Sequence, residues 1–151
     1  YCYYIWNAPQ RNPFCDRYAL RRAQRLDENA LHTAAQQFVG THDFSAFCSA
    51  DADTADAVRT VYRCAVTREG DMVIFTVEAD GFLYNMVRIM VGTLLDIAAG
   101  RFSADTVIAA LKTGDRTLAG ATAPAKGLFL KEVFYEKEGK ADGEKSPQGY
   151  R

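Results

Sequence analysis

One arginine lies in the middle of an otherwise apolar stretch, where a charge is costly unless it has a partner. Arg88 is the only cationic residue between Phe82 and Gly100, and Tyr84 precedes it by one helical turn. A guanidinium is always charged, and its fork of N–H donors suits a carboxylate or a phosphate. If Arg88 is partly buried, an unpaired charge there costs about 3–5 kcal/mol. The pattern leaves two possibilities open: Arg88 binds an anionic group, or its side chain reaches solvent from the helix edge.

A histidine and a carboxylate stand side by side at His42-Asp43. Such a histidine can act as a general base, but no nucleophile lies at a recognisable spacing from this pair. A hydrolase that used Cys48 or Ser45 with His42 would need a nucleophile elbow and an oxyanion hole, and the sequence carries neither signal. A His-Asp pair can also cap a turn, and the pattern leaves both roles open.

Two aromatic segments near the start of the sequence could contact bases or phosphates. In residues 1–6, alternation puts Tyr1 and Tyr3 on one side of a strand and the other aromatic residues on the opposite side. One set is core, and the other could offer a ring to a base. Residues 8–25 combine two aromatic residues with five arginines: Phe14, Tyr18, Arg11, Arg17, Arg21, Arg22 and Arg25. These side chains either bind a nucleic-acid backbone or form a solvated loop.

Length and composition limit the classes of protein to which this chain can belong. The 151 residues fit one domain, and the net charge of −1 means that RNA binding must depend on local clusters of charge. No apolar run reaches the roughly 18 residues that a membrane helix needs. The sequence begins inside a predicted strand, without an initiator Met or a signal peptide, so we expect a fragment. No metal-ligand spacing links the four cysteines, which we expect to be reduced: Cys2, Cys15, Cys48 and Cys64.

Hydrophobic periodicity predicts an α+β domain. Helical spacing of apolar residues, with Asp27 as the first N-cap, predicts helices at residues 28–39, 82–99 and 103–113. Alternating and β-branched runs predict strands at residues 1–6, 58–67, 72–79 and 128–135, with a hairpin loop at 68–71. We expect a mostly antiparallel sheet with the helices on one face. The remaining expectations are a compact loop at 41–47, an exposed connector at 49–57 and a disordered tail at 136–151.

Several segments together resemble the tRNA pseudouridine synthase A family, in the family's order and over about residues 1–135. The matches are Y-x-Y-x-I-x-N at 1–7, G-x-H-D-F-x-x-F at 40–47, V-R-T at 58–60, F-L-x-x-M-V-R-x-x-V-G at 82–92, and D-R, T-A-P-A and G-L-x-L between 115 and 130. The match at 82–92 is the most specific. Beside Arg88 the sequence departs from the family pattern, with Tyr84-Asn85 where histidine is common and Ile89 where asparagine often follows.

The resemblance implies an enzyme that isomerises uridine to pseudouridine in the tRNA anticodon arm, at tRNA positions 38, 39 and 40. Family members cleave the N-glycosidic bond, turn the uracil and rejoin it through C5, using an aspartate and neither a cofactor nor a metal. That aspartate lies in an R-T-D-x-G motif of the N-terminal half, and this sequence contains no R-T-D. Residues 1–135 are therefore expected to be the C-terminal subdomain of the pseudouridine synthase fold, inactive when isolated.

The resemblance also implies roles for single residues. Arg88 matches the arginine that pairs with the catalytic aspartate, which favours the anion-binding possibility. Tyr1 matches the tyrosine that stacks on uracil and assists proton transfer, with Tyr3 as the alternative if the register differs by one repeat. The positions implied in substrate binding are His42, Asp43, Phe44, Leu128 and Leu130. The arginines expected to bind RNA are Arg21, Arg22 and Arg25.

The implied partners are the anticodon stem-loop of tRNA, the N-terminal half of the same enzyme and a second copy in a homodimer. We expect no membrane association and a cytoplasmic location. A non-catalytic RNA-binding or dimerisation module of the same fold is the alternative, in which Arg88 would bind phosphate or serve structure. An in-frame R-T-D-x-G upstream of Tyr1 would favour the enzyme, whereas a start codon near Tyr1 would favour the module.

Overall fold

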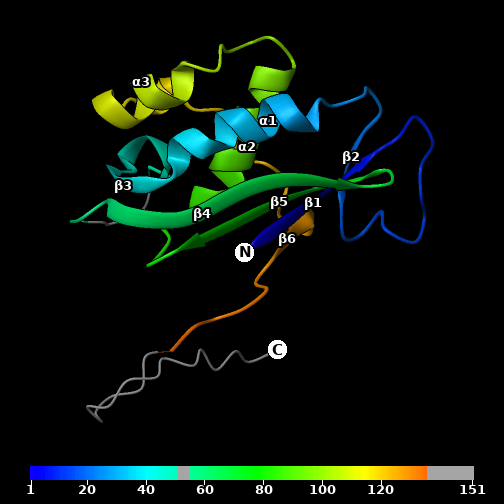
Figure 1. Cartoon of the computed structure of the whole chain (residues 1–151), viewed down its shortest axis with the longest axis horizontal. Helices are drawn as coiled ribbons and strands as arrows, with labels where there is room; N and C mark the ends of the chain where they lie inside the picture. The colour runs from blue at the N-terminus through cyan, green and yellow to red at the C-terminus, as the bar shows by residue number, and fades with distance from the viewer. Residues whose placement is uncertain (51–54, 136–151) are drawn as a thin grey trace.

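The computed structural model describes residues 1–50 and 55–135. In this part of the chain, six strands and three α-helices are joined by loops and short 3-10 turns (Figure 1). The strands are β1 (Cys2–Asn7), β2 (Leu20–Arg22), β3 (Gly40–Asp43), β4 (Val58–Glu69), β5 (Met72–Ala79) and β6 (Leu128–Phe129). The helices are α1 (Glu28–Ala35), α2 (Met86–Ala98) and α3 (Thr106–Thr113), and the 3-10 turns are η1 (Gln36–Phe38), η2 (Ser45–Phe47), η3 (Arg116–Leu118) and η4 (Ala125–Gly127).

The strands form one sheet in the order β2-β1-β5-β4-β3, and β6 also pairs with β1. Only the β1–β2 pair is parallel in the described part, and the other pairs are antiparallel. Because β5 occupies one edge of β1, β2 and β6 share the other edge at its two ends. The predicted α+β class and the mostly antiparallel sheet are confirmed.

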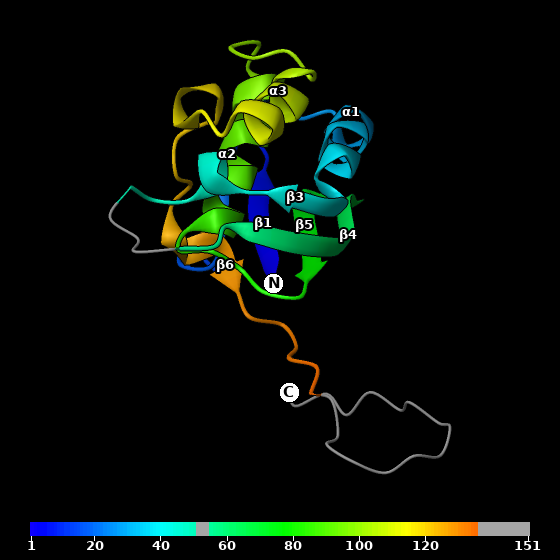
Figure 2. The same ribbon diagram turned by 90° about the vertical axis from the view of Figure 1, so that its left-hand side faces the viewer.

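The three helices lie on one face of the sheet, as predicted (Figures 1 and 2). Tyr3 and Ile5 of β1 point to that side and are 0% and 3% exposed, and β5 contributes Phe75 to the same core. The neighbouring side chains Tyr4 and Trp6 point to the other face and are only partly buried. The period of two along a strand therefore separates a core set from a more open set, as alternation predicts.

Helix α2 starts later than the sequence pattern suggested. The predicted helix at 82–99 begins only at Met86, because Asn85 has φ +60° and ψ 9°, which a right-handed helix cannot contain. Phe82 and Leu83 fit the apolar stripe for another reason: Phe82 packs against Tyr1, and Leu83 lies in the core. These two apolar residues lie in a loop but are packed against other side chains, so they made the predicted helix four residues too long at its start.

Other elements also differ from the prediction in their bounds, and two strands lie where loops were expected. The helix at 28–39 is α-helical to Ala35 and continues as η1, and α3 begins at Thr106 instead of residue 103. Strand β3 lies inside the expected loop at 41–47, and β2 lies inside the irregular stretch at 8–25. The last strand, expected at 128–135, ends at Phe129, because β6 reaches the start of β1 there and the following residues pass beyond it. The expected tail at 136–151, and residues 51–54 of the connector, lie outside the described residues.

Antiparallel pairing sorts the loops to two ends of the sheet. The start of β1, the end of β3, the start of β4 and the end of β5 meet at one end, which leads through residues 80–85 into α2; we call it the Arg88 end. The opposite end holds β2, the β4–β5 turn and the start of α1; we call it the Arg68 end. Within the described residues, no helix combines the length and the apolar character that crossing a membrane requires.

Candidate active site at the Arg88 end

The first turn of α2 places Arg88 at the junction of three loops. The turn begins after Asn85, whose left-handed backbone redirects the chain from residues 80–84 into the helix axis. The carbonyl group of Tyr84 accepts a hydrogen bond of 3.2 Å from the backbone N–H of Ser49, which joins the loop after η2 to this point. Arg88 lies one helical turn further on, where its side chain reaches the segment that precedes η4.

Arg88 is held by neutral groups. Its Nε donates to the carbonyl oxygen of Ala123 at 2.7 Å, and Nη1 donates to Oδ1 of Asn85 at 3.1 Å. The backbone carbonyl of Arg88 accepts from the N–H of Ala123 at 3.0 Å, so two hydrogen bonds join these residues. The side chain is partly buried, and none of the ion pairs found in residues 1–50 and 55–135 includes it. Its positive charge is therefore fixed in place but has no carboxylate partner in that part of the chain.

The segment that carries Ala123 packs on α2 backbone to backbone. A Cβ on Gly92 would lie 1.7 Å from the carbonyl oxygen of Ala121, and a Cβ on Gly120 would lie 2.6 Å from the Gly92 backbone. Thr93 Oγ1 accepts from the N–H of Gly120 at 2.8 Å. Two glycines therefore permit the close approach that fixes the acceptor for Arg88.

Tyr3 belongs to the same cluster. It is fully buried, and its hydroxyl group donates to the carbonyl of Pro124, next to Ala123, at 2.6 Å. Burial raises the pKa of the Tyr3 phenol to about 12, and the positive charge of Arg88 opposes that shift. Gly127 lies against the ring, since a Cβ there would be 2.8 Å from it. At neutral pH the phenol is thus a protonated donor beside the arginine.

Tyr1 lies at the edge of this cluster. Its ring packs edge-on against Phe82 with a centroid separation of 5.0 Å, and it is partly exposed. Arg88 donates to the carbonyl of Ala123, and the neighbouring carbonyl of Pro124 accepts from Tyr3 and not from Tyr1. Of the two tyrosines named from the sequence, the alternative one is therefore the one that lies with Arg88.

The two leucines expected near the pocket have different environments. Leu128 pairs across the sheet with Tyr3 and packs against the core, so it joins the cluster. Leu130 follows β6 and is 59% exposed. Only Leu128 is therefore held by the sheet beside Arg88 and Tyr3.

His42, Asp43 and Phe44 lie at the far edge strand of the sheet. The ring of His42 packs on Phe44, and its Nε2 hydrogen-bonds the carbonyl of Val39 at 3.0 Å. Asp43 accepts hydrogen bonds from the hydroxyl and the N–H of Ser45, which hold the pKa of its carboxyl below the usual range. Phe44 is fully buried in the core. Asp43 thus binds Ser45, the first residue of η2, and a role of these residues in substrate binding stays a prediction.

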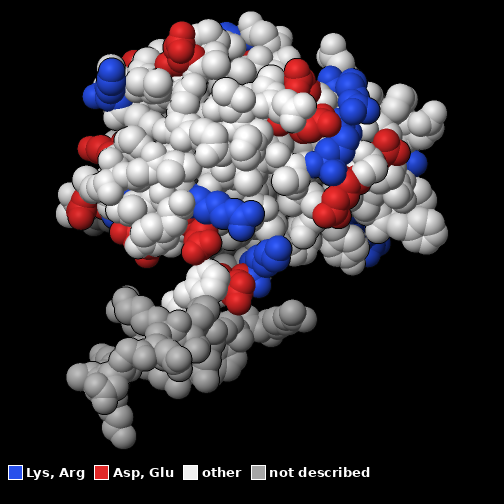
Figure 3. All heavy atoms as spheres, in the orientation of Figure 1, with Lys and Arg blue, Asp and Glu red and all other residues white. Residues whose placement is uncertain are grey.

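The three arginines expected to bind RNA lie at the Arg68 end. Arg22 and Arg25 are exposed, with 71% exposure for the Arg25 side chain, whereas Arg21 donates to the carbonyl of Pro9. Figure 3 shows basic side chains along the side where β2 lies, with acidic side chains between them. These arginines therefore lie at the opposite end of the sheet from the cluster around Arg88 and Tyr3.

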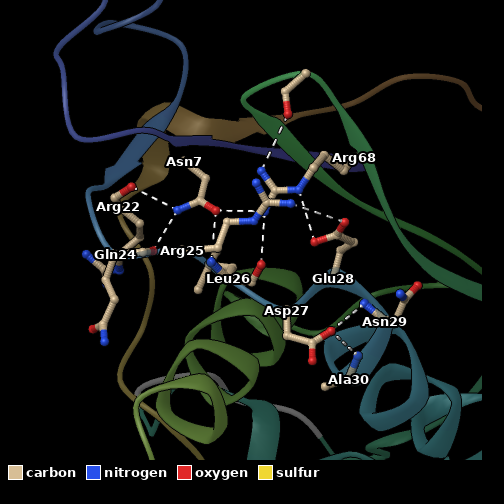
Figure 4. A network of polar contacts seen from close by, with 11 residues as sticks. Asn7, Arg22, Gln24, Arg25, Leu26, Asp27, Glu28, Asn29, Ala30 and Arg68 are labelled. Carbon is tan, nitrogen blue, oxygen red and sulfur yellow. Dashed lines mark hydrogen bonds and ion pairs between the residues drawn. The ribbon is translucent and has the colours of Figure 1, made fainter.

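Sequence reasoning missed a second partly buried arginine at that end. Arg68 Nε lies 3.0 Å from Glu28 Oε2, and its Nη2 donates to Asn7 Oδ1 at 2.8 Å and to the carbonyl of Leu26 at 3.0 Å (Figure 4). The Arg68 side chain is 10% exposed. The only sequence signal was its position before the glycine of the β4–β5 turn, which says nothing about partners in α1 and β1.

The opposite face of the sheet carries a pocket of about 320 Å³, away from Arg88. Its lining is mostly apolar and consists of Cys2, Tyr4, Cys15, Tyr18, Met72, Phe129 and Lys131. All four cysteines are free, with Cys2 and Cys64 buried and the other two partly buried. In the described part of the chain, no three metal-ligating side chains come together.

Comparison with known proteins gives a consistent set of relatives. Residues 34–136 match the family model described as tRNA pseudouridine synthase. The chain is 45% identical to tRNA pseudouridine synthase A of Geobacillus kaustophilus over 138 residues, covering 91% of this chain and 54% of the relative. The enzyme of the same name from Shouchella clausii is 47% identical over 135 residues, covering 89% and 52%. The chain thus spans about half the length of the curated relatives it matches.

Proposed function

This chain belongs to the tRNA pseudouridine synthase family, and from that premise we propose that it supplies the arginine half of the active site. The complete enzyme converts uridine to pseudouridine in the anticodon arm of tRNA, at positions 38 to 40. The bond between N1 and C1′ of the ribose breaks, the uracil turns, and C5 bonds to C1′. C5 then loses its proton and N1 gains one, so the product is an isomer of the substrate. The aspartate that takes part comes from the N-terminal half, so this chain alone is inactive.

The observation that carries the proposal is the uncompensated charge of Arg88. Ala123 and Asn85 fix two nitrogen atoms of the guanidinium but leave its charge without a carboxylate among the described residues. A carboxylate that docks on the remaining N–H groups would be oriented, and its pKa would be lowered, so it would stay ionised. That is the state in which an aspartate can act on the uridine.

Tyr1, whose ring is partly exposed at the Arg88 end, is the tyrosine that we propose to stack on uracil, and we propose that this site is supported from the core by Tyr3. Tyr3 lies beside Arg88, its hydroxyl group is oriented by the carbonyl of Pro124, and Leu128 lies opposite it. A protonated phenol can pass a proton only if a base accepts it, and the raised pKa of Tyr3 favours the donor form. We therefore assign Tyr3 the role of holding Pro124 and the segment next to Arg88, since a fully buried ring cannot stack on a base.

The partners follow from this assignment. We propose that tRNA crosses the sheet from the Arg88 end to the exposed Arg22 and Arg25, which contact phosphates. The N-terminal half of the enzyme docks on the Arg88 end, and two complete subunits form a homodimer. Since tRNA is the substrate, we place the enzyme in the cytoplasm. His42 and Asp43 would line the far wall, with the buried Phe44 supporting the His42 ring.

Substitution of Arg88 in the full-length enzyme tests the proposal. Arg88→Ala should slow pseudouridine formation by about 10²–10³-fold, the loss typical of removing a preorganised charged donor, while the Kd for tRNA changes less than threefold. Arg101→Ala is the matched control, because Arg101 lies just after the same helix, pairs with Asp96 and is 65% exposed. Wild-type turnover by Arg88→Ala would refute the assignment. An equal loss of tRNA binding and turnover would instead support an RNA-binding or dimerisation module.

A further inference from the structure

Asn85 has a backbone and a side chain that its position at the start of α2 does not explain. Within residues 1–50 and 55–135 it is the only residue other than glycine with a positive φ, which is +60°. An asparagine before a helix commonly caps it by accepting from the N–H two or three residues later. Asn85 makes no such side-chain hydrogen bond. The helix therefore begins with a strained residue that gives up the usual capping interaction.

The amide of Asn85 is used for two other contacts. Its Oδ1 accepts from Nη1 of Arg88 at 3.1 Å, and its Nδ2 donates to Oγ of Ser49 at 2.8 Å. Both contacts are partly shielded from solvent. Because the guanidinium can only donate, the amide oxygen must face Arg88, and the amide nitrogen is left to donate to Ser49. The left-handed backbone is what places this amide beside a side chain only three residues further along the helix.

Two anchors determine the orientation of the Arg88 guanidinium. The contact from Nε to Ala123 fixes one edge of the planar group, and the contact from Nη1 to Asn85 stops rotation that would swing the other nitrogen atoms away. Both acceptors are neutral. A carboxylate in the place of the Asn85 amide would hold the guanidinium equally well, but it would also neutralise the charge that an incoming carboxylate needs.

We infer that Asn85 is a positioning residue for the proposed reaction, held by Ser49, which aims the Arg88 guanidinium at the catalytic carboxylate without neutralising it. This inference rests on the proposed function. It gives the loop after η2 a part in the site, because Ser49 joins that loop to Asn85 and to the backbone of Tyr84. A purely structural role for Asn85 would require only that it hold the loop.

Three substitutions in the full-length enzyme separate these roles. Asn85→Gly keeps a residue that accepts the left-handed backbone and removes the amide, and it should lower kcat about tenfold with KM for tRNA unchanged. Asn85→Asp keeps an acceptor for Nη1 but adds a competing negative charge, so it should lower kcat about 100-fold without lowering the Tm. Ser49→Ala removes only the acceptor for Asn85 Nδ2, and its kcat should fall about threefold.

The matched control is another asparagine that contacts an arginine. Asn7 Oδ1 accepts from Nη2 of Arg68 at the opposite end of the sheet. Asn7→Ala should lower the Tm and leave kcat unchanged at a temperature where the protein is folded. If Asn85→Asp keeps wild-type kcat, or if Asn85→Gly lowers the Tm and leaves kcat intact, Asn85 is structural and the inference fails.

A measurement on Arg88 itself separates this inference from the proposed function. In the NMR spectrum of the ¹⁵N-arginine-labelled enzyme, rotation about Nε–Cζ of Arg88 should be slow, with distinct Nη signals, and Asn85→Gly should average these signals. Unchanged distinct signals in Asn85→Gly would overturn the inference. If the signals average but Arg88→Ala retains full turnover, the proposed function fails, and the positioning role for catalysis falls with it.

Discussion

Arg68 and Arg88 lie at opposite ends of one sheet, and they differ in whether a carboxylate pairs with the guanidinium. Arg68 is surrounded by its own partners: the carboxylate of Glu28, the amide of Asn7 and the carbonyl of Leu26 (Figure 4). The Glu28 backbone N–H first, and Arg68 second, hold the pKa of the Glu28 carboxyl below its usual range. Every part of this network comes from residues 1–50 and 55–135, so the charge of Arg68 is satisfied by the fold.

Arg88 shares the partial burial but has only an amide and a carbonyl as partners in the described part of the chain. Such an arrangement fixes the direction of the guanidinium and leaves its charge available. Burial and hydrogen bonding alone therefore do not distinguish an arginine with a structural role from the one that we propose for the active site. The sign and source of the partners do, because a charge that the fold needs is neutralised within the fold.

The two ends also differ in how tightly their backbones pack. At the Arg88 end, α2 and residues 119–123 meet so closely that a Cβ on Gly92 would overlap the carbonyl of Ala121. At the Arg68 end, Gly70 in the β4–β5 turn has φ +60° and open space around its missing Cβ. Gly92 is needed because two backbones come into contact there, and Gly70 because its backbone has a positive φ.

Gly92→Ala should therefore give the largest effect. A Cβ 1.7 Å from a backbone oxygen cannot be relieved by a side-chain rotation, so either α2 or residues 119–123 must move, at a cost of more than about 3 kcal/mol of unfolding free energy. The displaced Ala123 would also release Arg88. Denaturant unfolding of the full-length enzyme measures the first effect, and turnover in the folded range measures the second.

Gly70→Ala is the control for this substitution. It should cost about 1 kcal/mol, because only the left-handed backbone of the turn is strained, and turnover should be unchanged. Equal destabilisation by the two alanines would show that close packing does not distinguish the Arg88 end.

Arg68→Ala should give the next largest loss of stability, and no specific loss of catalysis. The substitution removes charge-assisted hydrogen bonds to Asn7 and Leu26, which predicts a loss of about 3 kcal/mol of unfolding free energy. Arg88→Ala should cost about 1 kcal/mol, since it removes bonds to neutral acceptors only. Urea unfolding at neutral pH gives both values. The comparison breaks if Arg88→Ala is the more destabilising of the two.

Local patterns in the sequence were sufficient for the elements that depend on neighbours along the chain. The β4–β5 hairpin forms across Gly70 as the glycine predicted, and Asp27 caps α1 by accepting from the N–H groups of Asn29 and Ala30. Strand β5 has the bounds predicted from its alternation. These features need only residues within a few positions of each other, so a pattern can encode them.

Contacts between distant residues were not encoded in this way. The pairing of β1 with β2 and β6 depends on which edge of β1 is left open by β5, and no pattern within β2 or β6 records it. The contact between Arg88 and Ala123 spans 35 residues, and the one between Arg68 and Asn7 spans 61. The family motif drew attention to Arg88, whereas the neutral partners around it, and the burial of Tyr3 beside it, needed the structure.

Tyr3 gives the smallest and most specific test of the Arg88 end. Tyr3→Phe removes the hydrogen bond to the carbonyl of Pro124 and should cost about 1 kcal/mol at neutral pH, whereas Tyr1→Phe should cost little, because its ring packs on Phe82 without needing the hydroxyl group. The pKa of Tyr3 is raised to about 12 from an ordinary value of 10, so the folded protein holds this proton more tightly than the unfolded chain. The free energy of unfolding of the wild type should therefore fall as the pH rises from 10 towards 12.

The pH dependence isolates the phenol from the rest of the cluster. Unfolding by urea between pH 8 and 11 should show a smaller decline for Tyr3→Phe than for the wild type, and the wild-type decline for Tyr1→Phe. A parallel decline in all three proteins would mean that the Tyr3 phenol is not the buried proton donor. Arg88 would then have no protonated phenol beside it.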